Sequence, residues 1–226
     1  MGNTLLVDYK LLSYGKISST QNIALDIVAE GKAQDHMIIM ADMQSAGRGR
    51  YKRPWISQRG NLYASFLYEI EERDVSLAYV IAVAIAETLF SFGVKPQIKW
   101  PNDILIDGKK VSGTLTEYSG KFVIIGIGIN IKSCPKISKY DTTKLENYVN
   151  VSREEVLKKL MINLDKWRKA DFFNVRKRWL DFAIGLNKYV KYRGEVLEFI
   201  DINENGALVL RKGTEYLLVY GDEIIM

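Results

Sequence analysis

Hydrophobic positions in the first half of the chain follow helical and strand spacing on either side of one long polar interruption. Ser19 and Thr20 stand where they can cap a helix whose apolar residues share one face. The interruption, residues 44–60, combines glycine and proline with basic residues, and such long loops tend to be functional or mobile. The pattern predicts, in order, a helix over 21–30, a buried strand over 37–41, a strand over 61–70 and an apolar helix over 77–92.

The second half of the chain contains short strands, then two helices, then more short strands. The dipeptide Asp107-Gly108 between two apolar runs is a strong hairpin signal, so residues 95–131 are expected to form a meander of an antiparallel or mixed sheet. Residues 152–155 form a capping box that opens an amphipathic helix, and a second helix is expected over 172–182. Five short strands within about forty residues near the C-terminus predict a small barrel of the SH3 type.

These elements predict an α+β fold with a mixed or antiparallel sheet and packed helices. We expect a large domain over residues 1–185 and a small SH3-like C-terminal domain over 186–226, which suits a chain of 226 residues. The apolar run 77–92 contains Glu87 and is too short to cross a bilayer. No secretion signal is evident at the N-terminus, so a cytoplasmic location is expected.

Composition narrows the chemistry that the chain can perform. The formal net charge of +5 suits an anionic ligand but does not by itself indicate nucleic acid binding. The single cysteine, Cys134, excludes an internal disulfide, and the single histidine, His36, argues against a His-rich metal site. Catalysis by a Ser-His or Cys-His pair would have to use His36, whose place at the head of an apolar run is more typical of a strand end.

The basic loop contains Gly47-Arg48-Gly49-Arg50 and, further along, Trp55. Glycines let a backbone approach a ligand closely, and arginines bind phosphate or carboxylate oxygens with paired donors. The loop is not a dinucleotide fingerprint, because the third glycine would fall on Lys52, and it is not a Walker loop, because the chain contains no Gly-Lys-Ser/Thr. A solvated basic loop or an RNA-binding segment is the alternative.

Three further stretches combine polar groups with apolar surroundings. Lys99 ends an apolar strand before Trp100-Pro101-Asn102-Asp103, so its ammonium needs an anionic partner, such as Asp103 or a phosphate, unless it reaches water. Alternating glycines in Gly126-Ile127-Gly128-Ile129-Asn130 indicate either the close approach of a ligand or tight packing against a helix. Ser19-Thr20-Gln21 and Gln44 offer hydrogen-bonding groups, although capping alone explains Ser19 and Thr20.

In this order and at these intervals, the four stretches together resemble the motifs of biotin protein ligases. The resemblance extends from about Leu11 to the C-terminus, and Lys109–Glu117 is similar to the family's Lys-x-x-Gly-Ile-Leu-x-Glu strand, with Thr114 in place of an aliphatic residue. It implies a class II synthetase-like catalytic domain followed by a small SH3-like domain. Two departures are Lys52, where many members have glycine, and the lack of room for the N-terminal helix-turn-helix of members that repress transcription. No DNA-binding function is therefore expected.

The resemblance implies an ATP-dependent ligase that forms biotinyl-5′-AMP from biotin and ATP and transfers biotin to a lysine of a carrier protein. ATP would bring Mg²⁺, held largely by phosphate oxygens and water.

Lys99 and Arg50 are the catalytic residues that the resemblance implies. Lys99 would bridge the biotin carboxylate and the α-phosphate, and Arg50 would stabilise the adenylate phosphate. The residues expected to bind biotin are Ser19, Thr20, Gln44, Arg48, Gly49, Arg50, Lys99 and Gly113. Those expected to bind ATP are Arg48, Arg50, Trp55 over the adenine, Lys99, Asn102, Asp103 and Asn130 at the adenine edge, with no strong direct metal ligand.

The resemblance also implies partners. These are the biotin carrier domain of a biotin-dependent carboxylase and, from the habit of the family, a second copy in a homodimer, with no membrane. The nearest alternative is a lipoate-type ligase, because it shares the fold and a related acyl-adenylate chemistry. A non-enzymatic RNA-binding module is the third candidate, and it leaves the stretch Lys99–Asp103 unexplained.

Overall fold

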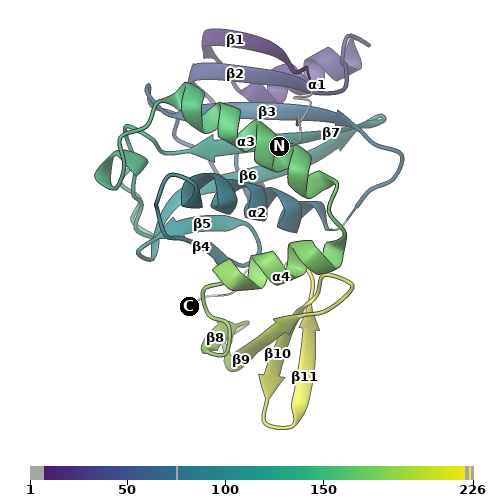
Figure 1. The fold of residues 1–226 in the computed structure, drawn as a ribbon, viewed down its shortest axis with the longest axis vertical. Helices are drawn as coiled ribbons and strands as arrows, with labels where there is room; N and C mark the ends of the chain where they lie inside the picture. Colours follow the sequence, from purple (N-terminus) through teal and green to yellow (C-terminus); the bar gives the residue numbers. More distant parts are fainter. Residues whose placement is uncertain (1–7, 75, 222–223, 225–226) are drawn as a thin grey trace, which may run out of the picture.

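A seven-stranded mixed sheet is the largest element of the computed structural model, which describes residues 8–74, 76–221 and 224 (Figure 1). The strand order is β1-β2-β3-β7-β6-β5-β4, and only β1 and β2 run parallel. The strands are β1 (Lys10–Ile17), β2 (Met37–Gln44), β3 (Leu62–Glu69), β4 (Pro96–Lys99), β5 (Asp103–Ile106), β6 (Lys109–Ser119) and β7 (Phe122–Ile129). The expected α+β class with a mixed sheet is confirmed.

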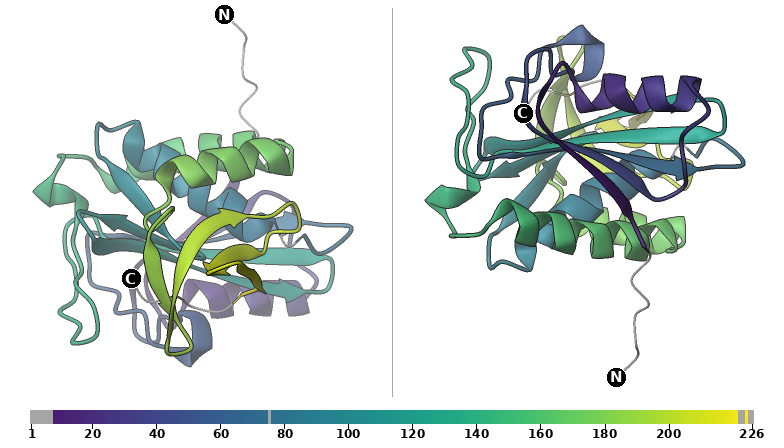
Figure 2. Two further views of the ribbon diagram at one scale, coloured as in Figure 1. Left: turned by 90° about the horizontal axis from the view of Figure 1, so that it is seen from below. Right: turned by 90° about the horizontal axis from the view of Figure 1, so that it is seen from above.

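Helices cover both faces of this sheet, which makes the sheet the middle layer. They are α1 (Thr20–Ala29), α2 (Leu77–Phe90), α3 (Arg153–Arg168) and α4 (Phe172–Phe182). Figure 2 shows the sheet edge-on, with α1 on one face and α2 and α3 on the other. α2 is apolar around most of its circumference because it packs against α3, α4 and the sheet at once. None of the helices in the described residues is both long and apolar enough to cross a bilayer.

Local signals fix where several elements begin and end. Ser19 caps α1 by accepting a hydrogen bond from the Gln21 N–H, and Ser152 and Glu155 form the expected capping box at the start of α3. One-turn 3₁₀ helices occur at Arg50–Lys52 and Leu145–Asn147. β1 is the one strand of the large sheet that the sequence pattern did not predict, because an edge strand with mostly exposed residues carries little hydrophobic signal.

The remaining strands form a second, antiparallel sheet of four strands, which fits the expected small SH3-like domain. These are β8 (Tyr189–Tyr192), β9 (Glu195–Ile202), β10 (Leu208–Lys212) and β11 (Glu215–Val219). The sequence pattern predicted five strands here, whereas the described residues form four. The Trp179 ring of α4 packs edge-on against Phe199 of this sheet and against Tyr79 and Trp100 of the large domain. The Tyr79 hydroxyl also donates to the Gly206 carbonyl at 2.6 Å.

Replacement of Trp179 tests this joint. Trp179→Ala is expected to lower the free energy of unfolding by about 3–5 kcal/mol, because it removes a fully buried indole and leaves a cavity between the two sheets. Phe173→Ala, on the same helix, is the control and is expected to change stability by less than about 0.5 kcal/mol, because that side chain is 67% exposed. Urea denaturation followed by circular dichroism measures both, and equal effects of the two changes would contradict the packing described.

Candidate active site

A cavity of about 580 Å³ gathers residues from distant parts of the chain. Its walls come from the start of α1, the loop after β2, the turn between β4 and β5, and the neighbouring strands β6 and β7. Its volume lies within the range of small-molecule sites. The expected site residues that line it are Ser19, Thr20, Gln44, Arg48, Gly49, Arg50, Trp55, Lys99, Asn102, Asp103 and Gly113.

Asn130 is the one expected site residue that does not line this cavity. It follows β7 and is buried, and its Nδ2 donates to the backbone carbonyl of Thr143 at 3.1 Å. Its Oδ1 has no hydrogen-bond partner among the described residues. The expected contact of Asn130 with an adenine edge therefore stays a prediction.

One end of the cavity is neutral and polar. The Thr20 N–H donates to Gln44 Oε1 at 2.8 Å, and Gln44 Nε2 donates to Ser57 Oγ at 2.8 Å. Ser19 Oγ accepts from the Gln21 N–H, and its own proton has no acceptor among the described residues. Ser19 and Thr20 are buried, so a ligand that covers them must replace the hydrogen bonds that they lose with water. This end suits a compact group that carries both donors and acceptors.

The two arginines of the loop have different partners. Arg48 forms a two-pronged ion pair with Glu117, with nitrogen–oxygen distances of 3.1 and 2.6 Å, which neutralises its charge. Arg50 donates instead to Asn102 Oδ1 at 3.0 Å and to the Gly221 carbonyl at 2.8 Å. No carboxylate of the described residues pairs with Arg50, so its positive charge is available to an anion in the cavity.

Lys99 and Asp103 face each other at the ends of β4 and β5, yet they do not form an ion pair. Asp103 pairs with Lys110 at 2.6 Å, and no carboxylate of the described residues pairs with Lys99, which is half-buried. The sequence suggested two anionic partners for Lys99, and one of them, Asp103, is paired with Lys110 instead. A bound anion is the partner that is left.

The sequence analysis assigned no role to Lys110, which also lines the cavity. It is the first residue of the Lys-x-x-Gly pattern that ends at Gly113, so the signal was present in the motif. Asn102 was expected to contact the nucleotide. Its Nδ2 donates to Thr114 Oγ1 at 2.8 Å, and its Oδ1 accepts from Arg50 at 3.0 Å. The expected contact of Asn102 with the nucleotide stays a prediction.

The Trp55 ring, which lines the cavity, packs against bare backbone of β6 and β7. Gly113 and Gly128 are direct partners in the β6–β7 ladder, and the Trp55 ring occupies the space that side chains there would fill. A Cβ at Gly128 would lie 2.4 Å from Trp55 Cε2, and one at Gly126 would lie 2.7 Å from Gln21 Oε1 of α1. The reading of tight packing against a helix holds for Gly126, which admits a side chain of α1. Gly128 admits a side chain of the basic loop, and the close approach of a ligand stays a prediction.

Tyr63 contributes to the cavity wall without acting as a base. Its burial raises the pKa of its hydroxyl to about 12, so the hydroxyl stays protonated at neutral pH. It donates to the Gln58 carbonyl at 2.8 Å and accepts from Asn61 Nδ2 at 2.9 Å.

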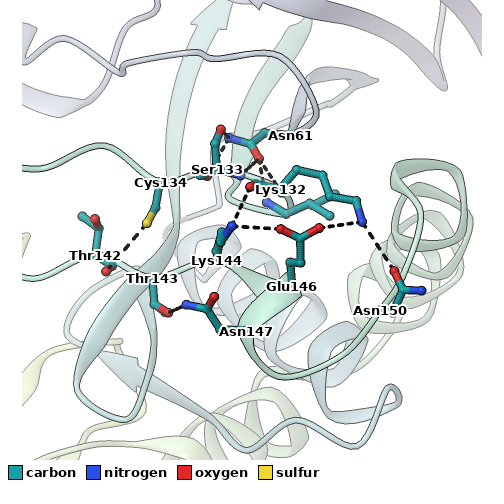
Figure 3. A network of polar contacts seen from close by, with 11 residues as sticks. Asn61, Lys132, Ser133, Cys134, Thr142, Thr143, Lys144, Glu146, Asn147 and Asn150 are labelled. Carbon is teal, nitrogen blue, oxygen red and sulfur yellow. Dashed lines mark hydrogen bonds and ion pairs between the residues drawn. The ribbon is translucent and has the colours of Figure 1, made fainter.

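A segment after β7 borders the cavity through its tip, residues 139–141. Figure 3 shows how its base is held, with Asn61 Oδ1 accepting from the backbone N–H groups of residues 131–133 at 2.8 to 3.1 Å. Further along, the Lys144 and Lys132 ammonium groups bind Glu146 and hold the pKa of that carboxyl below its usual value. The tip is exposed, and just after it the backbone is held to β6, because the Lys110 N–H donates to the Asp141 carbonyl at 2.9 Å and the Thr143 N–H donates to the Lys110 carbonyl at 2.9 Å. This bordering segment was not expected from the sequence.

Residues 14–130 match the model of the biotin/lipoate A/B protein ligase family, and this span is more than half of the chain. The chain belongs to this family. It is 30% identical over 98% of its length to the bifunctional ligase/repressor BirA of Bacillus spizizenii, covering 75% of that protein. It is also 30% identical to the biotin–[acetyl-CoA-carboxylase] ligase of Paracoccus denitrificans, over 76% of this chain and 83% of that one.

A solved structure extends this similarity to the whole fold. The biotin protein ligase from Aquifex aeolicus in complex with biotin and ATP superimposes with a TM-score of 0.83 and 28% identity, over 95% of this chain and 97% of that chain. The resemblance to biotin protein ligases that the motifs indicated is therefore confirmed.

The contact between Trp55 and Gly128 gives a prediction for this family member. Gly128→Ala is expected to displace the Trp55 indole, because the new methyl group would overlap it, and to shift tryptophan fluorescence to longer wavelength. Gly15→Ala is the control, since nothing lies within 4 Å of its added Cβ. The shift should vanish in a Trp55→Phe background, and a shift that persists there would contradict the assignment.

Proposed function

We propose that this protein joins biotin to a lysine of a carrier protein in two steps that consume ATP. In the first step, a biotin carboxylate oxygen attacks the α-phosphorus of ATP, the bond to pyrophosphate breaks, and biotinyl-5′-AMP forms. In the second step, the carrier lysine amine attacks the acyl carbon, AMP leaves, and the amine loses a proton. Both steps develop negative charge on phosphate oxygens, so the protein must supply positioned cations rather than a nucleophile.

One cavity with a neutral polar end and a cationic end carries this proposal. Ser19, Thr20 and Gln44 form the neutral end, and Lys99 and Arg50 form the cationic end. Biotin also has a neutral polar end, the ureido ring, and a charged end, the carboxylate. A relative of similar fold, from Aquifex aeolicus, is described in complex with biotin and ATP, which supports the same pair of substrates here.

The two alternatives fit the cavity less well. A lipoyl group ends in a dithiolane ring, which offers no N–H or carbonyl to the buried groups of Ser19, Thr20 and Gln44. An RNA-binding surface would need exposed and unpaired cations, whereas Arg48 is paired with Glu117. No observation favours either alternative over biotin.

The proposed roles follow the two ends of the cavity. Lys99 binds the biotin carboxylate and the α-phosphate, and Arg50 stabilises the adenylate phosphate. The Arg48 guanidinium holds Glu117, so the contribution of Arg48 and Gly49 to the junction of biotin and phosphate comes from their backbone. The backbone of Gly113 lies along the biotin tail. Trp55 turns from its place on Gly128 to cover the adenine.

ATP is proposed to enter as its Mg²⁺ complex. Mg²⁺ binds one or two carboxylates together with substrate phosphates, and Asp103 and Asp141 are the carboxylates that line the cavity. No cluster of three or more metal-binding side chains occurs among the described residues. The triphosphate oxygens and water are proposed to supply most of the ligands of the ion. Asp103 stands within 2.6 Å of Lys110, so that lysine would compete with the ion.

The remaining proposals concern partners and place in the cell. The acceptor is proposed to be the biotin carrier domain of a carboxylase, and the protein is proposed to act in the cytoplasm as a homodimer. Sedimentation equilibrium with and without ligand measures the oligomeric state. The division into domains at residue 186 is proposed on the change from helices to the small sheet.

Titration calorimetry with biotin, followed by a pyrophosphate-release assay with biotin and ATP, tests the function. Saturable biotin binding and pyrophosphate release that requires biotin are expected, and EDTA should abolish the release but not the binding. Lipoate and RNA serve as comparison ligands. Binding of lipoate or RNA with no binding of biotin would overturn the proposal.

Lys99→Ala tests the cationic end. It is expected to slow adenylate formation by about 100- to 1000-fold, because it removes a charge aimed at the α-phosphate, while biotin still binds through the neutral end. Lys95→Ala, at an exposed lysine just before β4, is the control and should keep the wild-type rate. Near-normal adenylate formation by Lys99→Ala would show that Lys99 is not catalytic.

A further inference from the structure

Ser57 is a buried serine that lies directly behind the neutral end of the cavity without lining it. Its hydroxyl contacts the side chain of Gln44, which does line the cavity. We propose that Ser57 is a positioning residue that fixes the Gln44 amide so that it offers an N–H donor to the ligand. This inference deepens the proposed function and rests on it, because it identifies which biotin atom Gln44 recognises.

A chain of hydrogen bonds with defined direction supports this proposal. The Trp55 carbonyl can only accept, so the Ser57 hydroxyl uses its single proton on that carbonyl, at 3.0 Å. Ser57 Oγ can then only accept from Gln44, and Gln44 places its Nε2 there, at 2.8 Å. At the other end of the amide, the Thr20 N–H can only donate and therefore faces Gln44 Oε1, at 2.8 Å. The orientation of the amide is fixed from both sides.

Close packing keeps this arrangement rigid. A Cβ at Gly47 would lie 2.8 Å from Ser57 Oγ and 3.1 Å from Gln44 Nε2, so the backbone of the loop presses on both groups. Gln44 and Ser57 are also paired by an isolated β-bridge, which aligns their backbones. Without the Ser57 hydroxyl, the Gln44 Nε2 would lose its partner at a place that is closed on the loop side.

The fixed orientation determines what the ligand must present. Gln44 Nε2 has two protons, and only the one directed at Ser57 has a partner among the described residues. Because the side chain lines the cavity, the second N–H is available to a ligand acceptor. In biotin the matching acceptor is the ureido carbonyl oxygen.

Biotin binding by Ser57→Ala is the first test. The change is expected to weaken biotin binding about tenfold, the size of one hydrogen bond, and to leave the KM for ATP within about twofold of the wild-type value. Ser45→Ala is the matched control, because Ser45 lies in the same segment but is exposed and bonds the Ile17 carbonyl. Ser57→Cys, which keeps the size but accepts hydrogen bonds weakly, replaces Ser57→Ala if the alanine variant does not fold.

A ligand of opposite polarity separates positioning from a structural role. In the guanidinium analogue of biotin, the ureido C=O is replaced by C=NH₂⁺, which can only donate. The wild-type protein should bind biotin more tightly than the analogue, and Gln44→Glu should reverse that preference. Ser57→Ala should reduce the difference between the two affinities, because the Gln44 amide then lacks its hydrogen bond to Ser57. In a Gln44→Ala background, Ser57→Ala should have no further effect on biotin affinity.

The outcomes distinguish this inference from the function on which it rests. If the wild-type protein binds no biotin, the proposed function and this inference both fail. If it binds biotin but Ser57→Ala binds as tightly and discriminates as well as the wild type, only the inference fails. A further loss of biotin affinity in the Gln44→Ala background would also overturn it, because Ser57 would then act independently of Gln44.

Discussion

The cavity depends on a patch of bare backbone at the middle of the large sheet. The register of β6 and β7 sets Gly113 directly opposite Gly128, so two neighbouring positions of one sheet face carry no side chain. A sheet face normally projects side chains several ångströms above the backbone. Here that depth is occupied by the Trp55 ring. The start of α1 and the arginine loop border this hollow but do not create it.

The electrostatics of the site depend on the different partners of two arginines in the loop, Arg48 and Arg50. Arg48 is neutralised by Glu117, which lies on the same strand as Gly113, and this pair fastens the loop to the sheet. Arg50 is held by the neutral Asn102 and so keeps its charge. An ion pair stabilises geometry, whereas a cation with no carboxylate partner among the described residues can bind an anion. Two residues of one type, 2 positions apart in the sequence, therefore differ in the partners that they have.

The sequence predicted the elements whose signals are local. It could not predict contacts between residues that are distant in the sequence. The caps at Ser19 and Ser152 gave the starts of α1 and α3 because capping depends only on neighbouring residues. Every expected site residue except Asn130 lines the cavity, but Tyr63, Lys110 and residues 139–141 also line it and were not expected. The partner of Arg48 could not be predicted, because Glu117 lies 69 positions away and the pair forms only after β6 enters the sheet. For the same reason the sequence could not show that Asn130 does not line the cavity.

Trp179 also bears on how this architecture can be rearranged during evolution. Its ring contacts Trp100, next to Lys99, and Phe199 of the small sheet, so the two sheets share one aromatic joint. A recombination event that exchanged only the small sheet would leave Trp179 facing a foreign surface. An exchange of α4 together with the small sheet would instead break the contacts of Trp179 with Tyr79 and Trp100. The residues on both sides of this aromatic cluster are therefore expected to change together.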